Sequence, residues 1–376
     1  MALSRRIVVR TIQPTGPEAD RRPSRKTAIR LGYVPLTDAA PLLVAREFGF
    51  FARHDCEVVL SRELGWASIR DKLVHGELDA AHALCGLPFA LRLGLGCVAT
   101  DCVAPLILNL HGNAITLSTA LRREGVVDGP SLAEFVRTRR RSRTLVFGVV
   151  SLHSTHAWLL HSWLTQSGLR PDEEVRTVVV PPAQLAANLH AGNLDGFCVG
   201  EPWNSVAIAH GVGWCAAASC QFAPGHPEKV LAVRGEFVRS EPERHSRLVA
   251  ALLEACAFCA DPAHAEAILQ VLSRREHLGI PVSRLRPAWA GPFAAGCGTV
   301  LHVPDFLVFQ RGDSNEPTAA RAGWVAQHLL GPDARAQLSP VELGRIFRHD
   351  LFVAARDRLS ASPSHDSRFE IQSHAA

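Results

Sequence analysis

The stretch Ser154-Thr155-His156 combines polar side chains in a way that suits the binding of a small anion. It stands directly before a helical pattern. Hydroxyl side chains cap a helix N-terminus, and the free backbone N–H groups there attract negative charge. The ring of His156 could donate a further hydrogen bond to the same anion. Simple capping by Ser154 and Thr155, and a surface position for His156, are the alternatives that the pattern leaves open.

Trp66 and Lys229 are two further candidates for contact with such a ligand. Trp66 opens a helical stretch and offers one N–H donor beside a wide aromatic face. Lys229 is one of only three lysines among 40 basic residues, and it begins an apolar run. Core packing of the tryptophan and solvent exposure of the lysine are the ordinary alternatives.

Other polar residues stand where predicted strands end. Thr37 and Asp38 follow the strand at 28–34, and Glu201 follows the strand at 194–199. In open parallel sheets, ligands bind beyond the carboxyl ends of the strands. We therefore expect these residues at one cleft, although a helix-initiating proline beside a packed tryptophan would also explain the segment Gly200-Glu-Pro-Trp-Asn.

An internal repeat predicts how these residues are positioned. Gly76-Glu-Leu-Asp recurs as Gly192-Asn-Leu-Asp, and the same offset of 116 residues aligns Gly32 with Gly148. The first copy is predicted to hold strands at 28–34, 57–60 and 78–83 and helices at 39–52 and 66–75; the second holds strands at 144–150, 175–180 and 194–199 and helices at 155–167 and 183–191. Strands alternating with helices predict an α/β protein with parallel sheets covered on both faces.

The repeat predicts two doubly wound lobes joined by crossings at 105–117 and 229–234, which together form a hinge. Helices predicted beyond residue 240 would pack back on the first lobe. The predicted division is a disordered leader at 1–27, lobe I at 28–117 plus 230–356, lobe II at 118–229 and a disordered tail at 357–376. Two unrelated α/β domains are the alternative.

Composition excludes several classes of protein. The 376 residues are 47% hydrophobic and 20% charged, and the formal net charge of +4 comes from residues 1–30, which hold eight basic and two acidic residues. Because the excess lies in this segment, a nucleic-acid-binding face is disfavoured. The sequence has no apolar run of about 20 residues and no secretory h-region, so we expect no membrane span and a cytoplasmic location.

Signatures of catalysis and of metal binding are absent from the sequence. There is no G-x-G-x-x-G, phosphate-binding loop, G-x-S-x-G or H-E-x-x-H motif. The ten cysteines sit mostly in apolar runs, and the pair Cys256-x-x-Cys259 lies within a helical pattern without a second pair at zinc spacing. A cleft with donors and no evident nucleophile favours binding over catalysis, with no cofactor and no metal.

Several motifs in order resemble the nitrate-binding proteins of the nitrate/bicarbonate ABC-transporter group. They are Leu31-Gly-Tyr-Val-Pro-Leu-Thr-Asp, Gly65-Trp-Ala-Ser, His111-Gly-Asn-Ala-Ile-Thr, Ser154-Thr-His, Gly200-Glu-Pro-Trp-Asn and His226-Pro-Glu-Lys. The resemblance implies the type II periplasmic-binding-protein fold and a pocket in which Trp66, His156 and Lys229 surround the anion. A pocket glutamine of the family falls at His111, where this sequence departs. Asn113, in the same motif, joins the candidate set.

The resemblance and the missing export signal together predict a cytoplasmic sensor of nitrate or nitrite. Such a sensor holds an RNA-binding antiterminator of the ANTAR type and releases it when the anion binds. The alternative is the solute-binding component of an ABC transporter, periplasmic or membrane-associated, whose export signal was missed. Bicarbonate stays open as the ligand, because Glu201 or Asp38 could accept its hydroxyl proton. An enzyme on the same scaffold, which also hosts pyrimidine-precursor synthesis, is the third reading.

Overall fold

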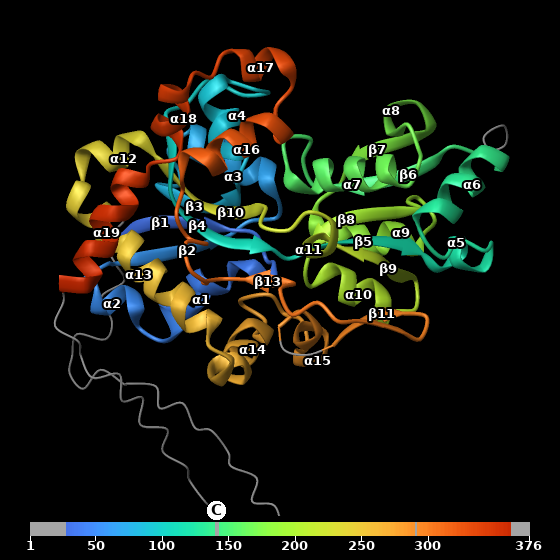
Figure 1. Ribbon diagram of the computed structural model, residues 1–376. Coiled ribbons are helices and arrows are strands. Elements are labelled where there is room, and N and C mark those ends of the chain that lie inside the picture. Colours follow the sequence, from blue (N-terminus) through green and yellow to red (C-terminus); the bar gives the residue numbers. More distant parts are fainter. Residues whose placement is uncertain (1–27, 140–142, 290–291, 362–376) are drawn as a thin grey trace, which may run out of the picture.

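The computed structural model describes residues 28–139, 143–289 and 292–361. Two lobes lie side by side, each a sheet with helices on both faces (Figure 1). The predicted leader at 1–27 lies outside the described residues, as does the predicted tail from residue 362 onward. The first residues of that tail are helical, however, because helix α19 runs over His349–Ala361.

The first lobe is built on a six-stranded sheet in the order β13-β4-β10-β3-β1-β2. Its strands are β1 (Ile29–Tyr33), β2 (Val58–Arg62), β3 (Ala80–Leu84), β4 (Cys102–His111), β10 (Pro227–Arg234) and β13 (Leu307–Val308). Its helices are α1 (Ala40–Glu47), α2 (Phe50–Arg53), α3 (Trp66–Val74), α4 (Leu87–Leu93), α12 (Gly235–Ser240), α13 (Pro242–Ala260), α14 (Ala265–Ser273), α16 (Ala319–Leu329), α17 (Pro332–Ala336), α18 (Pro340–Ile346) and α19. The helix predicted at 39–52 is divided, because Gly49 adopts a left-handed φ of 75° between α1 and α2.

The second lobe has a five-stranded sheet in the order β7-β6-β8-β5-β9. Its strands are β5 (Asn113–Ser118), β6 (Leu145–Val149), β7 (Val175–Val179), β8 (Gly196–Gly200) and β9 (Gly213–Ala218). Its helices are α5 (Thr119–Arg123), α6 (Gly129–Arg139), α7 (Thr155–Gln166), α8 (Pro171–Glu174), α9 (Leu185–His190), α10 (Trp203–Ala209) and α11 (Ser219–Phe222). The α/β class is confirmed, but the prediction of purely parallel sheets is wrong. β10 runs antiparallel to both of its neighbours and β5 to both of its own, because each enters its sheet from the other lobe.

The internal repeat is confirmed by matching contacts in the two lobes. A Cβ on Gly32 would lie 2.5 Å from Leu78, and one on Gly148 would lie 2.5 Å from Leu185 and 3.0 Å from Leu194. Leu78 and Leu194 are themselves 116 positions apart. Each glycine thus lets a strand approach the leucines that pack over it. The repeat is therefore a structural duplication of the strand–helix–strand unit.

The chain passes between the lobes more often than the two predicted crossings. The first crossing is confined to Gly112, between β4 and β5, and the second precedes β10. A third excursion follows α15 (Val282–Leu285), where β11 (Phe293–Gly296) and β12 (Thr299–Leu301) form a hairpin. β11 lies against β9 of the second lobe (Figure 1), and Phe293 and Phe306 share a cluster with Ala114 and Cys215 of that lobe. The segment beyond residue 240 therefore contacts both lobes.

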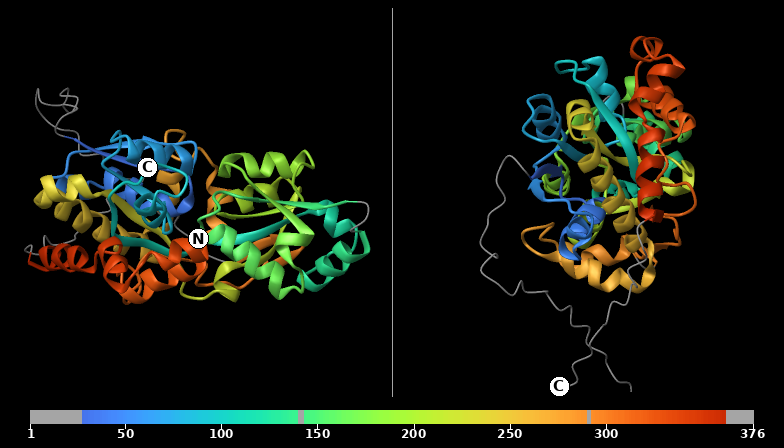
Figure 2. Two further views of the ribbon diagram at one scale, coloured as in Figure 1. Left: turned by 90° about the horizontal axis from the view of Figure 1, so that it is seen from above. Right: turned by 90° about the vertical axis from the view of Figure 1, so that its left-hand side faces the viewer.

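The predicted lobe limits differ from the sheets at two places. β5, assigned to lobe I, lies in the sheet of the second lobe, and the stretch 229–234, taken as a crossing, is a central strand of the first sheet. The C-terminal helices lie on the first lobe, as Figure 2 shows in red. Among the described residues, no single helix is long and apolar enough to cross a membrane, although α13 and α14 pass that test together as a pair bent by 84°.

Candidate functional site

A cluster of ionised side chains lies between the lobes, centred on Lys229. Its Nζ forms an ion pair with Asp38 Oδ2 at 2.8 Å and donates a hydrogen bond to Glu228 Oε1 at 2.7 Å, and the three side chains are at most 3% exposed. Lys229 and Glu228 come from β10, and Asp38 lies in the turn after β1. The alternative that Lys229 faces solvent is excluded, because its side chain is fully buried. A buried ammonium requires partners, and the two carboxylates supply them.

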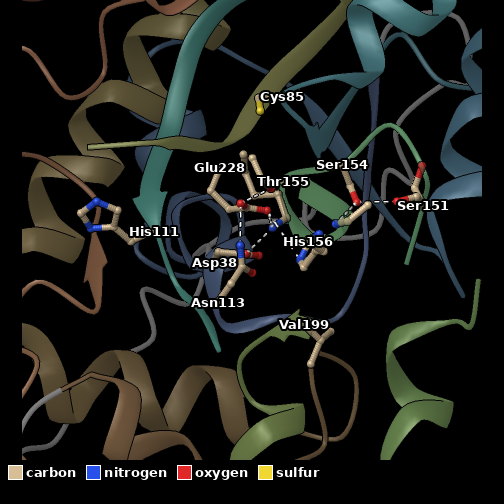
Figure 3. A network of polar contacts seen from close by, with 12 residues as sticks. Asp38, Cys85, His111, Asn113, Ser151, Ser154, Thr155, His156, Val199 and Glu228 are labelled. Atoms are coloured by element: carbon tan, nitrogen blue, oxygen red, sulfur yellow. Dashed lines mark hydrogen bonds and ion pairs between the residues drawn. The ribbon is translucent and has the colours of Figure 1, made fainter. Parts of the chain in front are cut away.

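Polar side chains of the second lobe contact the Glu228 carboxylate from the N-terminus of α7 and from the start of β5. Thr155 Oγ1 and Asn113 Nδ2 both donate to Glu228 Oε2, the latter at 2.6 Å. His156 Nε2 lies 3.6 Å from Glu228 Oε1, and both side chains are fully buried. Figure 3 shows these groups converging on Glu228. One carboxylate of the first lobe thus accepts hydrogen bonds from two polar side chains of the second, and His156 lies beside it.

Ser154 has the capping role that its position suggested. Its hydroxyl accepts from the backbone N–H of Ala157 at 3.2 Å and donates to the carbonyl of Ser151 at 2.5 Å. Both hydrogen bonds are local to the start of α7, at the edge of the group in Figure 3. Ser154 orients the helix N-terminus, whereas Thr155 and His156 point toward the cluster.

Trp66 belongs to the cluster through its ring. The Lys229 ammonium lies 5.6 Å from the centroid of the Trp66 ring, within the range of a cation–π contact. The centroid of the His82 ring lies 5.5 Å from that of the Trp66 ring, and His82 Nε2 is 2.9 Å from Asp38 Oδ1. A cavity of about 260 Å³ bordered by Trp66, α4 and the loop 150–153 adjoins this edge of the cluster.

Glu201 and Thr37 connect the two lobes next to Asp38. The backbone N–H of Thr37 donates to the Glu201 carbonyl at 2.7 Å. The Glu201 carboxylate accepts through Oε2 from the backbone N–H of Ser205 at 3.3 Å. Burial is the main effect on this group and raises its pKa to about 7. Glu201 is therefore partly protonated near neutral pH.

Burial and charge act in opposite directions on the other titratable groups. Burial alone would raise the pKa of both Asp38 and Glu228. The positive charge of Lys229 and the neighbouring histidines outweigh this effect. They hold the pKa of Glu228 at about 2 and the pKa of Asp38 well below its usual range. Burial lowers the pKa of His156 to about 4, against the attraction of Glu228. The cluster at neutral pH therefore has two carboxylates, one ammonium and a neutral His156.

Several buried donors around this cluster have no hydrogen-bond partner within the described parts of the chain. They are Trp66 Nε1, Thr37 Oγ1 and the two ring nitrogens of His156, of which one carries a proton. Buried polar groups are normally paired, so a set of orphaned donors in one place indicates a ligand with acceptor atoms. The same ranges contain no group of three or more His, Cys, Asp or Glu side chains arranged to hold a metal ion.

His111 does not join the cluster. Its Nε2 accepts from the backbone N–H of Gly225 at 2.6 Å, and its Nδ1 lies 2.8 Å from the carbonyl of Asp305. Figure 3 shows its ring apart from the groups around Glu228. His111 lies at the hinge, whereas Asn113, two residues later in the same motif, lies in the cluster.

Three residues of the site were missed from the sequence. Glu228 precedes Lys229 in a motif that drew attention only to the lysine, and His82 follows Ala80-Ala81 at the end of the first copy of the repeat. His226 Nδ1 lies 3.7 Å from Glu228 Oε2. Glu228 lies at the start of β10 and His226 directly before it, which was a usable signal, whereas His82 lies in the middle of β3. Only the fold shows that β3 and β10 are neighbours.

Glu201→Gln is expected to stabilise the chain at alkaline pH. The pKa of Glu201 is about 7 in the folded chain against an ordinary 4.5, so the folded state holds more protons between these values and loses stability as pH rises through them. The variant removes this loss. Its free energy of unfolding should therefore exceed that of the parent chain only slightly at pH 5 and by roughly 2–3 kcal/mol at pH 8. Urea unfolding at both values measures it. Glu77→Gln, at an exposed position, is the control, and an equal effect at both pH values would refute the assignment.

Comparisons with known proteins place this geometry in a family. The NMT1-like family model matches residues 22–273. The nitrate/nitrite binding protein NrtA of Synechococcus elongatus is 32% identical over 95% of this chain and 84% of its own length. The nitrate import ATP-binding protein NrtC of Synechocystis is 38% identical over 81% of this chain but only 46% of its own length, so the chain spans about half of that relative.

Solved structures agree with the observed architecture. The periplasmic nitrate-binding protein NrtA from Synechocystis PCC 6803 superposes with a TM-score of 0.82 and 27% identity, covering 91% of this chain and 92% of its own. The alkanesulfonate-binding protein SsuA from Xanthomonas axonopodis pv. citri has a TM-score of 0.62 at 13% identity over 86% of this chain and 97% of its own, a likeness of fold alone. The predicted periplasmic-binding-protein-like fold is thereby confirmed. The chain belongs to the NMT1-like family and, within it, to the nitrate/bicarbonate-type substrate-binding proteins.

Proposed function

We propose that the chain binds a small inorganic oxyanion, nitrate or nitrite first, in the cluster around Lys229. The observation that carries the proposal is the set of orphaned donors, Trp66 Nε1, Thr37 Oγ1 and His156, beside a fully buried lysine. Nitrate has acceptor atoms only and a diffuse single charge, so neutral N–H and O–H donors with one cation suit it. Relatives whose names include nitrate binding support the choice.

Donors from both lobes make binding and closure of the cleft interdependent. Trp66 and Thr37 belong to the first lobe, and His156 stands at the start of α7 in the second. An anion that bridges them has a higher affinity for the closed arrangement than for an open one, and this difference is what biases the two shapes. The helix N-terminus contributes further positive potential on the side of the second lobe.

Bicarbonate is a second candidate, and the carboxylates of the site favour it. Asp38, Glu228 and Glu201 are buried within or beside the cluster, and Glu201 Oε1 has no partner among the described residues. A bicarbonate hydroxyl could donate to such an oxygen, whereas nitrate has no proton to give. Relatives named as bicarbonate transport ATP-binding proteins support this alternative.

Calorimetric titration of the purified chain tests both ligands. Nitrate, nitrite and bicarbonate are titrated separately at pH 7.5, with chloride as the control anion. We expect one nitrate per chain with an affinity in the micromolar range. If bicarbonate alone binds at that strength, the second candidate replaces the first. If none of the three binds more tightly than chloride, the site is not an oxyanion site.

For the cellular role, the relatives support delivery of the anion to an ABC transporter more than cytoplasmic sensing. Relatives that match most of this chain are named as transport components or as binding proteins. The sensor remains a hypothesis with a direct test. The chain is mixed with an ANTAR-type antiterminator from the same organism and passed over a sizing column with and without nitrate. A complex that nitrate dissociates supports the sensor, whereas no complex in either condition supports delivery.

A further inference from the structure

His111 occupies a strained position at the end of β4, directly before the first crossing between the lobes. Its backbone φ is +61°, a left-handed conformation that non-glycine residues rarely adopt. The surrounding structure holds it there: its backbone N–H donates to the His226 carbonyl at 3.3 Å, and it pairs in register with Leu307 of β13. Strain of this kind persists only where several contacts over-determine the conformation, and it often marks a functional position.

The His111 side chain joins the other two passages between the lobes. The Gly225 N–H, in the second passage, can only donate, so His111 Nε2 must be the unprotonated acceptor. The proton of a neutral ring then sits on Nδ1, which donates to the Asp305 carbonyl in the segment that returns from the third excursion. Both bonds require the neutral ring, because a protonated ring has no acceptor nitrogen.

We propose that His111 is a positioning residue that clamps the three interlobe passages together, and that protonation of its ring releases the clamp and loosens the closed arrangement. The inference rests on the proposed function only where it predicts an effect on anion affinity. The hinge effect itself concerns the chain without ligand. His111 acts through Gly225 and Asp305 and does not touch the orphaned donors of the cluster.

The charged and titratable groups facing His111 come from the second and third passages and from β10. Asp305, whose carboxylate pairs with Arg311 at 2.6 Å, lies in the third passage. His226, with its ring 5.1 Å away, lies in the second passage, and Glu228 lies at the start of β10. Burial is the largest effect and lowers the pKa of His111, against the opposing effect of Asp305. The folded chain therefore resists protonating this ring, and the clamp weakens as pH falls below the ordinary histidine value of about 6.5.

Two variants separate the clamp from a merely structural role. His111→Gln keeps one donor and one acceptor but cannot titrate, and His111→Leu removes both. Hydrogen exchange reports the Gly225 amide. We expect its protection factor to fall about tenfold in His111→Leu at pH 7.5 and to stay within about threefold of the parent in His111→Gln. Between pH 7.5 and 5, protection should fall in the parent chain and stay level in His111→Gln.

The ring tautomer gives an independent readout that does not need the leucine variant to fold. In ¹⁵N-histidine-labelled chain, the signals lost in His111→Gln should show a neutral ring with the proton on Nδ1 at pH 7.5. His245→Gln, at a buried histidine of α13, is the control and should leave Gly225 protection unchanged. A proton on Nε2, or an equal fall of protection with pH in the parent and in His111→Gln, would overturn the proposal.

Nitrate titration separates this proposal from the proposed function. If the chain binds nitrate, His111→Leu should weaken the affinity about tenfold and His111→Gln should preserve it at pH 7.5. If no variant binds nitrate but the exchange and tautomer results hold, the clamp stands and the ligand assignment fails. If nitrate binds equally in all three chains, the clamp does not position the site.

Discussion

Lys229→Met is expected to abolish anion binding and to lower the free energy of unfolding by about 3–5 kcal/mol. The ammonium is fully buried between Asp38 and Glu228, at 2.8 and 2.7 Å. Its removal leaves two carboxylates without a counter-ion in a site with little solvent. Removing one partner of a buried ion pair lowers stability far more than removing one partner of a surface pair. Urea unfolding at pH 7.5 measures the stability, and calorimetry with nitrate measures the binding.

Lys72→Met is the matched control, since the chain has only three lysines. Lys72 forms one ion pair, with Glu63 at 2.7 Å, and its side chain is 34% exposed, so a change of no more than about 1 kcal/mol is expected. In the triple variant Lys229→Met, Asp38→Asn, Glu228→Gln the stranded charges are gone. Most of the lost stability should return without any return of binding. Equal stability of Lys229→Met and the parent chain would show that the buried triad is not ionised as described.

Trp66→Phe is expected to weaken nitrate binding by roughly 10- to 100-fold, the range for one hydrogen bond to a charged acceptor. The ring stays beside Lys229 and His82, so the variant removes little besides the indole N–H. Because that N–H has no partner among the described residues, the stability of the ligand-free chain should hardly fall.

Trp214→Phe is the control for this prediction. The Trp214 Nε1 is also buried without a partner in the described structure, but the ring belongs to the core of the second lobe, beneath Arg122. Its replacement should leave nitrate affinity unchanged. Calorimetric titration of both variants with nitrate measures the two affinities. Equal nitrate affinities for Trp66→Phe and the parent chain would show that Trp66 does not contact the anion.

The repeat was the part of the fold most accessible from the sequence. Asp79 and Asp195, 116 positions apart, each accept a backbone N–H of the first strand in their copy of the repeat, from Arg30 and Val146, at 2.8 Å. Such local strand and helix patterns depend on periodicity within a few residues, which a sequence displays. The antiparallel β5 and β10 and the excursion through β11 depend on pairings between distant segments, which apolar runs do not specify.

The site was predictable residue by residue but not as a network. Trp66, Thr155, His156 and Lys229 stand at strand ends or helix starts, where ligands of α/β sheets bind. Their partners could not be predicted, because Glu228 meets Thr155 across 73 residues of sequence. His111 and Asn113 are two positions apart in one motif, and only the left-handed turn at His111 and Gly112 sends one to the hinge and the other to the cluster.

A crystal structure of the chain grown with nitrate tests the central claim most directly. The account predicts one nitrate between the lobes, with its oxygens within hydrogen-bond distance of Trp66 Nε1 and a ring nitrogen of His156, and with Lys229 beside it. A cluster unchanged in its contacts, with nitrate found only on the outer surface or not at all, would contradict the assignment of this site to an oxyanion.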